Sequence, residues 1–287
     1  MHHKDTGEEL TNILKKSLPE DTFNWYQDKI SEIINDKSAK DLYLFYSLLR
    51  KKIPIDVNAD TREVSVELDD FLRLKSINLL ELSRIVVLIK ILLADEDFFA
   101  PKVAKLIEVA DTSELETFLK YLIFIPKAEN YKKVGVEALR TNIETIFCAI
   151  ALNNPYPSAY FNDQEWNQMY LKAAFMQLDL SNILDIEKRA NKDLTRIISD
   201  YAHERWAASR QIDPFFWRPV SNYIEGDLLE DMKHLFQSKD SLENHAAALC
   251  CFYSNNSEAK ALLDKYPNLK NNIANKSITW KNLKTAL

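Results

Sequence analysis

Residues 77–94 read INLLELSRIVVLIKILLA, and this stretch decides the fold class. A helix over these residues carries apolar side chains on most of its sides, which predicts that neighbouring elements bury it. Between Ile85 and Ala94 only Lys90 interrupts the apolar run, and the run is too short for the roughly 20 residues that a membrane span requires. We therefore expect a buried helix in the core of a helical protein.

The composition of the whole chain supports the same fold class. It contains 3 glycines among 287 residues, whereas glycine usually makes up about 7% of a protein. Sheets need glycine in hairpins and bulges, and phosphate-binding loops need it where backbone approaches the ligand. The chain is therefore expected to be all-α and to lack such a loop. Its net charge of −6 argues against a nucleic-acid partner.

Apolar residues recur every three to four positions through most of the chain, which indicates successive helices. The predicted helices cover 21–35, 38–50, 77–94, 101–109, 113–124, 129–140, 142–152, 163–178, 192–210, 214–224, 227–237, 241–253, 257–265 and 277–285. The stretch from Pro54 to Val66 is predicted to be a loop. The length alone suggests about two domains, but no Gly/Ser- or Pro-rich linker divides the chain, so a single domain over 1–287 is predicted. Short turns between helices favour a right-handed helix-pair array (a degenerate HEAT-like α-solenoid). An irregular helical bundle is the alternative.

The region 162–218 is the best candidate for a functional surface. It reads EWNQM over 165–169, DYAHERWAASR over 200–210 and DPFFWR over 213–218. It holds three of the five tryptophans and interleaves aromatic side chains with charged ones. Recognition surfaces often have this character, whereas an ordinary amphipathic helix segregates the two classes.

Arg205 is the most informative residue of this region. It falls in the middle of the apolar stripe of predicted helix 192–210, where a guanidinium must be paired because a buried lone charge is costly. It either forms a structural pair with another helix or points into a pocket for an anionic or carbonyl group. His203 lies on the opposite face, and Trp206 and Arg210 are four residues apart, within reach of stacking.

No catalytic or metal-binding motif is complete. His203-Glu204 matches the start of a zinc-protease HExxH, but Ala207 stands where the second histidine is required. Neither a metal nor another cofactor is expected. The start of the chain has no apolar export segment, so a cytoplasmic protein is expected. The cysteines lack CxxC spacing and are expected to be reduced core thiols: Cys148, Cys250 and Cys251.

Three segments of the region 162–218 resemble the EboA family of metabolite-traffic proteins. They are WNQMYLK at 166–172, RAN at 189–191 and YAHERWAASR at 201–210. The last of these is the most specific, and it departs from the family at Ser209, where family members usually have glycine.

The resemblance implies a role in trafficking a small metabolite or precursor towards the cell envelope. EboA proteins are encoded beside a prenyltransferase, a sugar-phosphate-cyclase-like enzyme and TIM-barrel hydrolases. No catalytic residue follows from the resemblance, because the family's own molecular activity is not established. It implies a candidate surface for a ligand or partner, made of Trp166, Asn167, Lys172, Arg189, Asn191, His203, Glu204, Arg205, Trp206 and Arg210.

The leading hypothesis is a non-catalytic helical binding or adaptor protein. Its expected partners are a small-molecule metabolite or proteins of the same gene cluster. No transmembrane segment is expected, and the hypothesis allows peripheral contact with a membrane surface. The alternative is an enzyme acting on a prenylated or cyclitol-like small molecule, with His203 as base and Arg205 stabilising negative charge. A third hypothesis makes the region a purely structural polar network.

Overall fold

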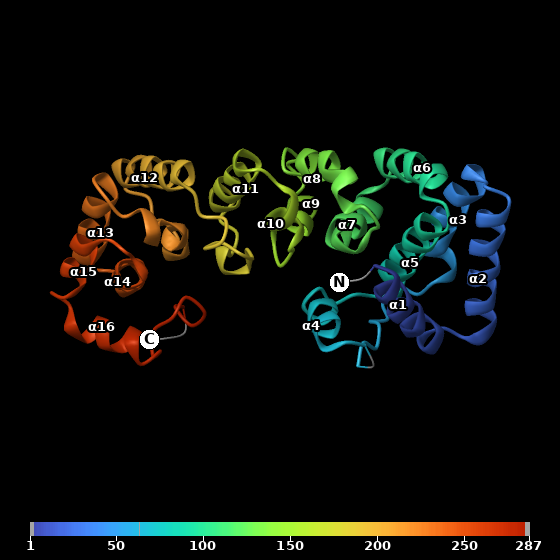
Figure 1. The fold of residues 1–287 in the computed structure, drawn as a ribbon, viewed down its shortest axis with the longest axis horizontal. Helices are drawn as coiled ribbons and strands as arrows, with labels where there is room; N and C mark the ends of the chain where they lie inside the picture. The colour runs from blue at the N-terminus through green and yellow to red at the C-terminus, as the bar shows by residue number, and fades with distance from the viewer. Residues whose placement is uncertain (1–2, 63, 285–287) are drawn as a thin grey trace. The chain divides into compact units, whose positions relative to one another are not determined.

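The computed structural model describes residues 3–62 and 64–284 (Figure 1). Within these residues the chain forms α-helices, short 3-10 helices and turns, and an isolated bridge between Asn58 and Asn78 is the only β-type pairing. The all-α prediction is confirmed. The chain divides into two compact units, residues 1–156 and 157–287.

Unit 1 is built almost entirely of short and medium helices. Its elements are α1 (His3–Ser17), α2 (Glu20–Asn35), α3 (Ala39–Lys52), α4 (Val66–Leu74), α5 (Leu79–Ala94), α6 (Glu96–Glu108), α7 (Thr112–Lys120), η1 (Leu122–Phe124), η2 (Ala128–Tyr131), α8 (Lys132–Ala138) and α9 (Glu144–Ala151). The short helix α10 (Tyr156–Tyr160) begins at the last residue of this unit.

The central helix of unit 1 is α5, as its sequence predicts. Asn78 begins it with a capping box, in which its side chain accepts from the backbone of Glu81 and the Glu81 carboxylate accepts from the backbone of Asn78. The helix packs against α1, α2, α3, α6 and α7, which buries most of its residues. Arg84 is buried among them and lies 3.6 Å from the Glu114 carboxylate, which compensates its charge.

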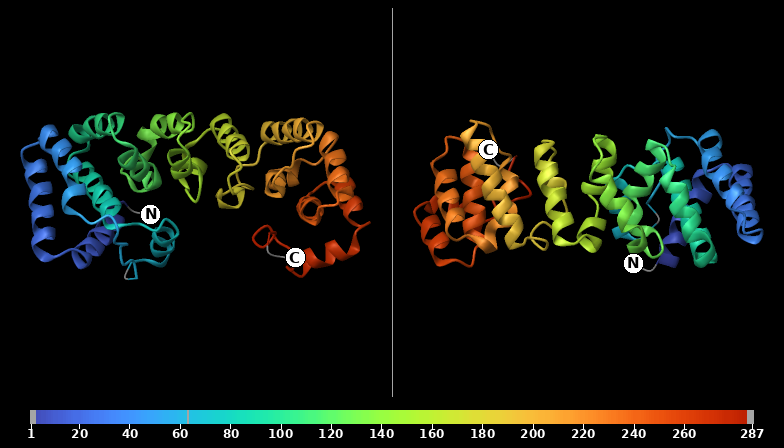
Figure 2. Two further views of the ribbon diagram at one scale, coloured as in Figure 1. Left: turned by 180° about the vertical axis from the view of Figure 1, so that it is seen from behind. Right: turned by 90° about the horizontal axis from the view of Figure 1, so that it is seen from above.

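Unit 2 has its own core around α14. Its elements are α11 (Asp163–Phe175), η3 (Leu180–Asn182), α12 (Lys192–Ala207), η4 (Pro214–Tyr223), α13 (Asp227–Gln237), α14 (Ser241–Tyr253), α15 (Ser257–Leu263) and α16 (Pro267–Ala274). Helix α14 packs against η4, α13, α15 and α16, and these orange and red segments stay together in the views of Figure 2. The small side chains at 246–248 are fully buried, which lets the neighbouring helices approach closely.

Several predicted helix boundaries are wrong. Pro101 does not open a helix but lies inside α6, because Asp95 caps the helix earlier by accepting from Phe98. Helices α1, α4 and α16 were not predicted. The predicted helix 277–285 is turn structure over 277–284, and residue 285 lies outside the described residues.

The arrangement of the helices as a solenoid, and the single domain over 1–287, stay predictions because they depend on how the two units are placed. Among residues 3–62 and 64–284, no helix has both the length and the apolar character that crossing a bilayer would demand.

Candidate functional site

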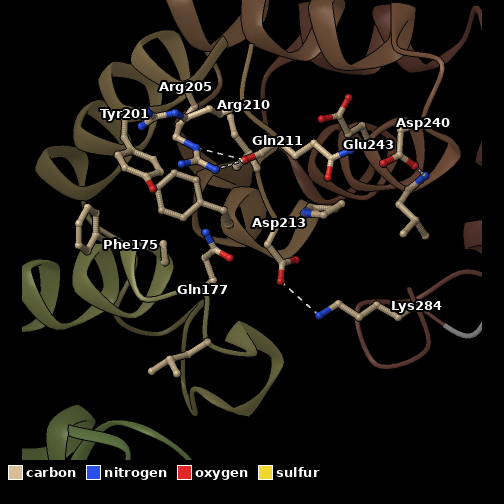
Figure 3. Close-up of a pocket in the computed structure, with 16 residues that line it drawn as sticks. Phe175, Gln177, Tyr201, Arg205, Arg210, Gln211, Asp213, Asp240, Glu243 and Lys284 are labelled. Carbon is tan, nitrogen blue, oxygen red and sulfur yellow. Dashed lines mark hydrogen bonds and ion pairs between the residues drawn. The ribbon is translucent and has the colours of Figure 1, made fainter. Parts of the chain in front are cut away.

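A cleft of about 820 Å³ opens in unit 2 (Figure 3). Its walls come from the end of α11, the end of α12, the beginning of η4, the beginning of α14 and the C-terminal turn. The lining residues are Ala174, Phe175, Gln177, Leu178, Tyr201, Arg205, Arg210, Gln211, Ile212, Asp213, Pro214, Phe216, Asp240, Leu242, Glu243 and Lys284. Two of the ten predicted site residues, Arg205 and Arg210, are among them.

The end of α12 places both arginines in the cleft. Ser209 adopts a left-handed conformation with φ of 53°, which stops the helix at Ala207 instead of the predicted residue 210. The backbone N–H of Arg210 donates to the Arg205 carbonyl, and that of Ser209 donates to the Trp206 carbonyl, each at 2.9 Å. This pair of bonds is the Schellman motif, which reverses the chain after a helix.

Arg205 is fixed by the segment that follows this turn. Its Nε and Nη2 atoms donate to the Gln211 carbonyl at 3.1 and 2.6 Å (Figure 3). Its guanidinium carbon lies 6.0 Å from the centre of the Tyr201 ring. The sequence argument that Arg205 must be paired is therefore met by a backbone carbonyl and an aromatic ring instead of a carboxylate.

Aromatic side chains form one side of the cleft. The Tyr201 ring packs edge-on against Phe216, with ring centroids 5.1 Å apart. Phe175 is 73% exposed at the end of α11, an unusual position for a phenylalanine. In Figure 3, Phe175 and Tyr201 lie on one side of the cleft, while Asp240, Glu243 and Lys284 lie on the other. The cleft therefore combines an apolar side with a charged one.

Lys284 closes part of the charged side. Its Nζ lies 3.2 Å from carboxylate oxygens of both Asp213 and Asp179. Partial burial lowers the pKa of Lys284, but these two carboxylates outweigh that effect and raise it. The other oxygen of Asp213 accepts from the backbone of Phe215 at 2.9 Å and begins η4. Asp213 and Lys284 therefore hold each other in place.

Two further predicted site residues form a partly buried amide pair instead of lining the cleft. Asn167 of α11 and Asn191 exchange side-chain hydrogen bonds at 3.1 and 2.9 Å. Asn191 also caps α12 by accepting from the backbone of Leu194 at 2.9 Å. The pair ties α11 to the beginning of α12.

Arg189 and Trp166 lie in the same interior region. The Arg189 guanidinium donates to backbone carbonyls of Pro157, Ser158 and Phe161 at 2.8–3.1 Å. It also lies 5.0 Å from the centre of the buried Trp166 ring. Arg189 thus supplies hydrogen-bond donors to backbone carbonyls of α10 and of the segment that joins α10 to α11.

His203 and Trp206 occupy the other face of α12, outside the cleft. His203 is 54% exposed, and its Nε2 lies 2.7 Å from the buried carboxylate of Asp231. Ser199 donates to the second oxygen of that carboxylate at 2.6 Å. Burial raises the pKa of Asp231, and the hydrogen bonds from Ser199 and His203 partly oppose that rise.

Trp206 lies between two other rings, with centroid distances of 5.6 Å to Trp217 and 4.1 Å to His234. Glu204 is exposed on the same helix, and Lys172 is half-buried on α11. None of these residues lines the cleft.

Sequence reasoning missed most of the second wall. Asp240, Glu243 and Lys284 come from segments that follow the region 162–218, and only the folding of unit 2 brings them opposite Arg205. The sequence signal for this wall is the helix-capping residue Asp240, which precedes α14 and accepts a hydrogen bond from the backbone of Leu242. In the described part of the chain, no group of three or more His, Cys, Asp or Glu side chains is arranged to hold a metal ion.

Comparison with known families identifies the chain. A family model described as "Metabolite traffic protein EboA" matches residues 6–221. The chain belongs to the EboA family. The match confirms the resemblance and extends it well beyond 162–218 into unit 1. No curated protein and no solved structure matched the chain.

The family match covers only some of the residues that line the cleft. Arg205 and Arg210 lie within the matched residues, whereas Asp240, Glu243 and Lys284 follow them. The lining residues that the structure describes include no serine, cysteine or histidine. The cleft of this EboA protein thus offers cationic donors, carboxylates and aromatic surface.

Proposed function

We propose that this EboA protein binds a small anionic metabolite in the unit 2 cleft and carries it unchanged, as its part in metabolite traffic. The observation that supports this most is the pair of guanidinium groups that line one cleft. Among the described residues, neither Arg205 nor Arg210 forms an ion pair with a carboxylate. Arginines without a carboxylate partner in a cleft are suited to a carboxylate or phosphate, because their planar guanidinium groups can donate two parallel hydrogen bonds to it.

The two arginines have different roles in this proposal. Arg205 is oriented before a ligand arrives, because the Gln211 carbonyl holds its Nε and Nη2 and leaves Nη1 without an acceptor among the described residues. A fixed donor loses little side-chain freedom on binding, which favours affinity. Arg210 is exposed and supplies a second positive charge.

The arrangement gives the enzyme alternative less support than the binding hypothesis. That alternative needs His203 and Arg205 around a common point, since a general base must reach the proton that it removes. His203 instead lies outside the cleft, and its Nε2 faces the Asp231 carboxylate at 2.7 Å.

The remaining predicted site residues fall into two groups in this proposal. The interior group positions α11 and the beginning of α12, and consists of Trp166, Asn167, Arg189 and Asn191. The group outside the cleft is a predicted contact surface for a partner protein, and consists of Lys172, His203, Glu204 and Trp206. Delivery towards the cell envelope is proposed from the family resemblance.

Retention of metabolites by the purified protein tests the proposal. The protein is dialysed against a small-molecule extract of the cells that make it, and retained compounds are identified by mass spectrometry. We expect at least one anionic compound to be retained by the wild type and lost in Arg205→Ala and Arg210→Ala.

Arg196→Ala is the matched control, because Arg196 is an exposed arginine of the same helix that pairs with Asp200 at 3.3 Å outside the cleft. It should retain the compound. Circular dichroism confirms that each variant is folded. Equal retention by the wild type and both cleft variants would remove the proposal.

A further inference from the structure

Apart from the ion pair between Lys284 and Asp213, the charged groups of the unit 2 cleft are separated by sign. Figure 3 shows Arg205 and Arg210 on the side of Tyr201, and Asp240 and Glu243 across the cleft from them. A site for a simple anion gains nothing from nearby carboxylates, because they repel it. The carboxylates therefore require an explanation of their own.

The three carboxylates that line the cleft differ in their interaction partners. Asp213 is neutralised by Lys284 at 3.2 Å, and Asp240 caps α14 by accepting from Leu242 at 2.9 Å. Glu243 lies in the first turn of α14 and has no cationic partner among the described residues. The positive end of the helix dipole favours a carboxylate there, and among the described residues no donor forms a hydrogen bond with the Glu243 side chain.

An apolar surface lies on the same side of the cleft as the arginines. Phe175, Tyr201 and Phe216 line it, and Phe175 is 73% exposed. An exposed phenylalanine in a cleft of about 820 Å³ leaves room for the body of a ligand to cover it.

We infer that the ligand is a dipolar small molecule, with an anionic group at Arg205 and Arg210, an amino group at Glu243, and an apolar or planar body between them. This inference rests on the proposed binding function and adds the amino group and the body. A cationic nitrogen supplies the donors that the Glu243 carboxylate lacks, and the arginines supply those of the anion.

The two ends of the proposed ligand lie on opposite sides of the boundary of the family match. The arginines lie within residues 6–221, and Glu243 follows them. The anion-binding end therefore belongs to the matched part of the chain, and the amine-binding end is contributed by α14.

Three related probes test the inference by calorimetry or ligand-observed NMR with the full chain. They are 4-(aminomethyl)benzoate, which carries both charges, 4-methylbenzoate, which carries only the anion, and 4-methylbenzylamine, which carries only the cation. We expect the dipolar probe to bind about tenfold more tightly than 4-methylbenzoate, the gain typical of one additional hydrogen-bonded ion pair.

Glu243→Gln should remove the preference, so that the dipolar probe and 4-methylbenzoate bind with about equal affinity. The control Glu225→Gln, at an exposed carboxylate outside the cleft, should retain the preference. Equal affinities of the two probes for the wild type, or no binding of the dipolar probe, would overturn the dipolar assignment. Metabolite retention by Arg210→Ala then decides separately whether the proposed binding function stands.

Discussion

Ser209 shows how one residue shapes the candidate site. It has a φ of 53° at the end of α12, a conformation that costs a residue with a Cβ atom about 1 kcal/mol relative to glycine. The resemblance to the EboA family places glycine at this position, and the structure supplies the physical reason.

Ser209→Gly should therefore stabilise the protein by about 0.5–1 kcal/mol. Glycine removes the backbone strain, but it also increases the conformational entropy of the unfolded chain, which offsets part of the stabilisation. Urea unfolding monitored by circular dichroism measures the change. Ser209→Ala is the control, since alanine keeps the strain and should bring no gain. A stability gain of equal size in both variants would contradict the account.

Lys75 provides a second test at the scale of single residues. Its Nζ donates to the Leu152 carbonyl at 2.8 Å in unit 1. Burial, together with the nearby charge of Lys120, lowers the pKa of Lys75 to about 8. Below pH 8 Lys75 is charged in both states, and the buried cation lowers the free energy of unfolding. As the pH rises from 8 towards the unfolded-state pKa of 10.5, the folded protein loses this proton first, so the destabilisation disappears.

Lys75→Met should therefore stabilise the folded protein more at neutral than at alkaline pH. The change in unfolding free energy on substitution should be more favourable at pH 7 than at pH 9.5, by about 2 kcal/mol. The comparison between pH values cancels the constant loss of the Leu152 hydrogen bond. Urea unfolding of both proteins at the two pH values gives the result, and an identical substitution effect at both would refute the assigned cause.

At the scale of elements, the Asn167–Asn191 pair joins α11 to α12. Asn191→Ala should cost about 2–3 kcal/mol, because it removes a helix cap and also leaves the buried amide of Asn167 without its partner. Asn162→Ala is the matched control, since Asn162 caps α11 with an exposed side chain and should cost only about 1 kcal/mol. Equal losses in chemical denaturation would show that the amide pair contributes nothing beyond capping.

The same elements show how far the sequence predicts the fold. Predicted helices 227–237 and 241–253 match α13 and α14 residue for residue, because apolar periodicity is distinct in both and Asp240 caps α14. Prediction failed at α16, where Pro267 begins the helix and the neighbouring asparagines gave no strong periodicity. Local patterns fix helices with distinct apolar stripes, and tertiary contacts decide the weaker ones.

The candidate site divides in the same way. Helical periodicity placed Arg205 in the apolar stripe of predicted helix 192–210, and in the structure the same part of α12 lines the cleft. The opposite wall required contacts between α14, η4 and the C-terminal turn, which no local pattern encodes. Likewise, Asp231 lies 28 residues after His203, so their hydrogen bond was invisible in the sequence.

At the scale of the whole molecule, the division into two units predicts independent folding of the second. All residues that line the cleft lie in 157–287, and α14 provides that unit with a buried core. We expect residues 157–287 alone to unfold cooperatively in urea and to bind the dipolar probe within about threefold of the full chain. A non-cooperative transition would show that unit 2 depends on unit 1.

The most direct test of the central claim observes the arginines themselves. In protein labelled with ¹⁵N-arginine, titration with 4-(aminomethyl)benzoate should shift the Nε–Hε signals of Arg205 and Arg210 along one saturable curve, while the signal of Arg196 stays in place. Saturable shifts confined to arginines outside the cleft, or no saturable shift at Arg205 and Arg210, would contradict the account.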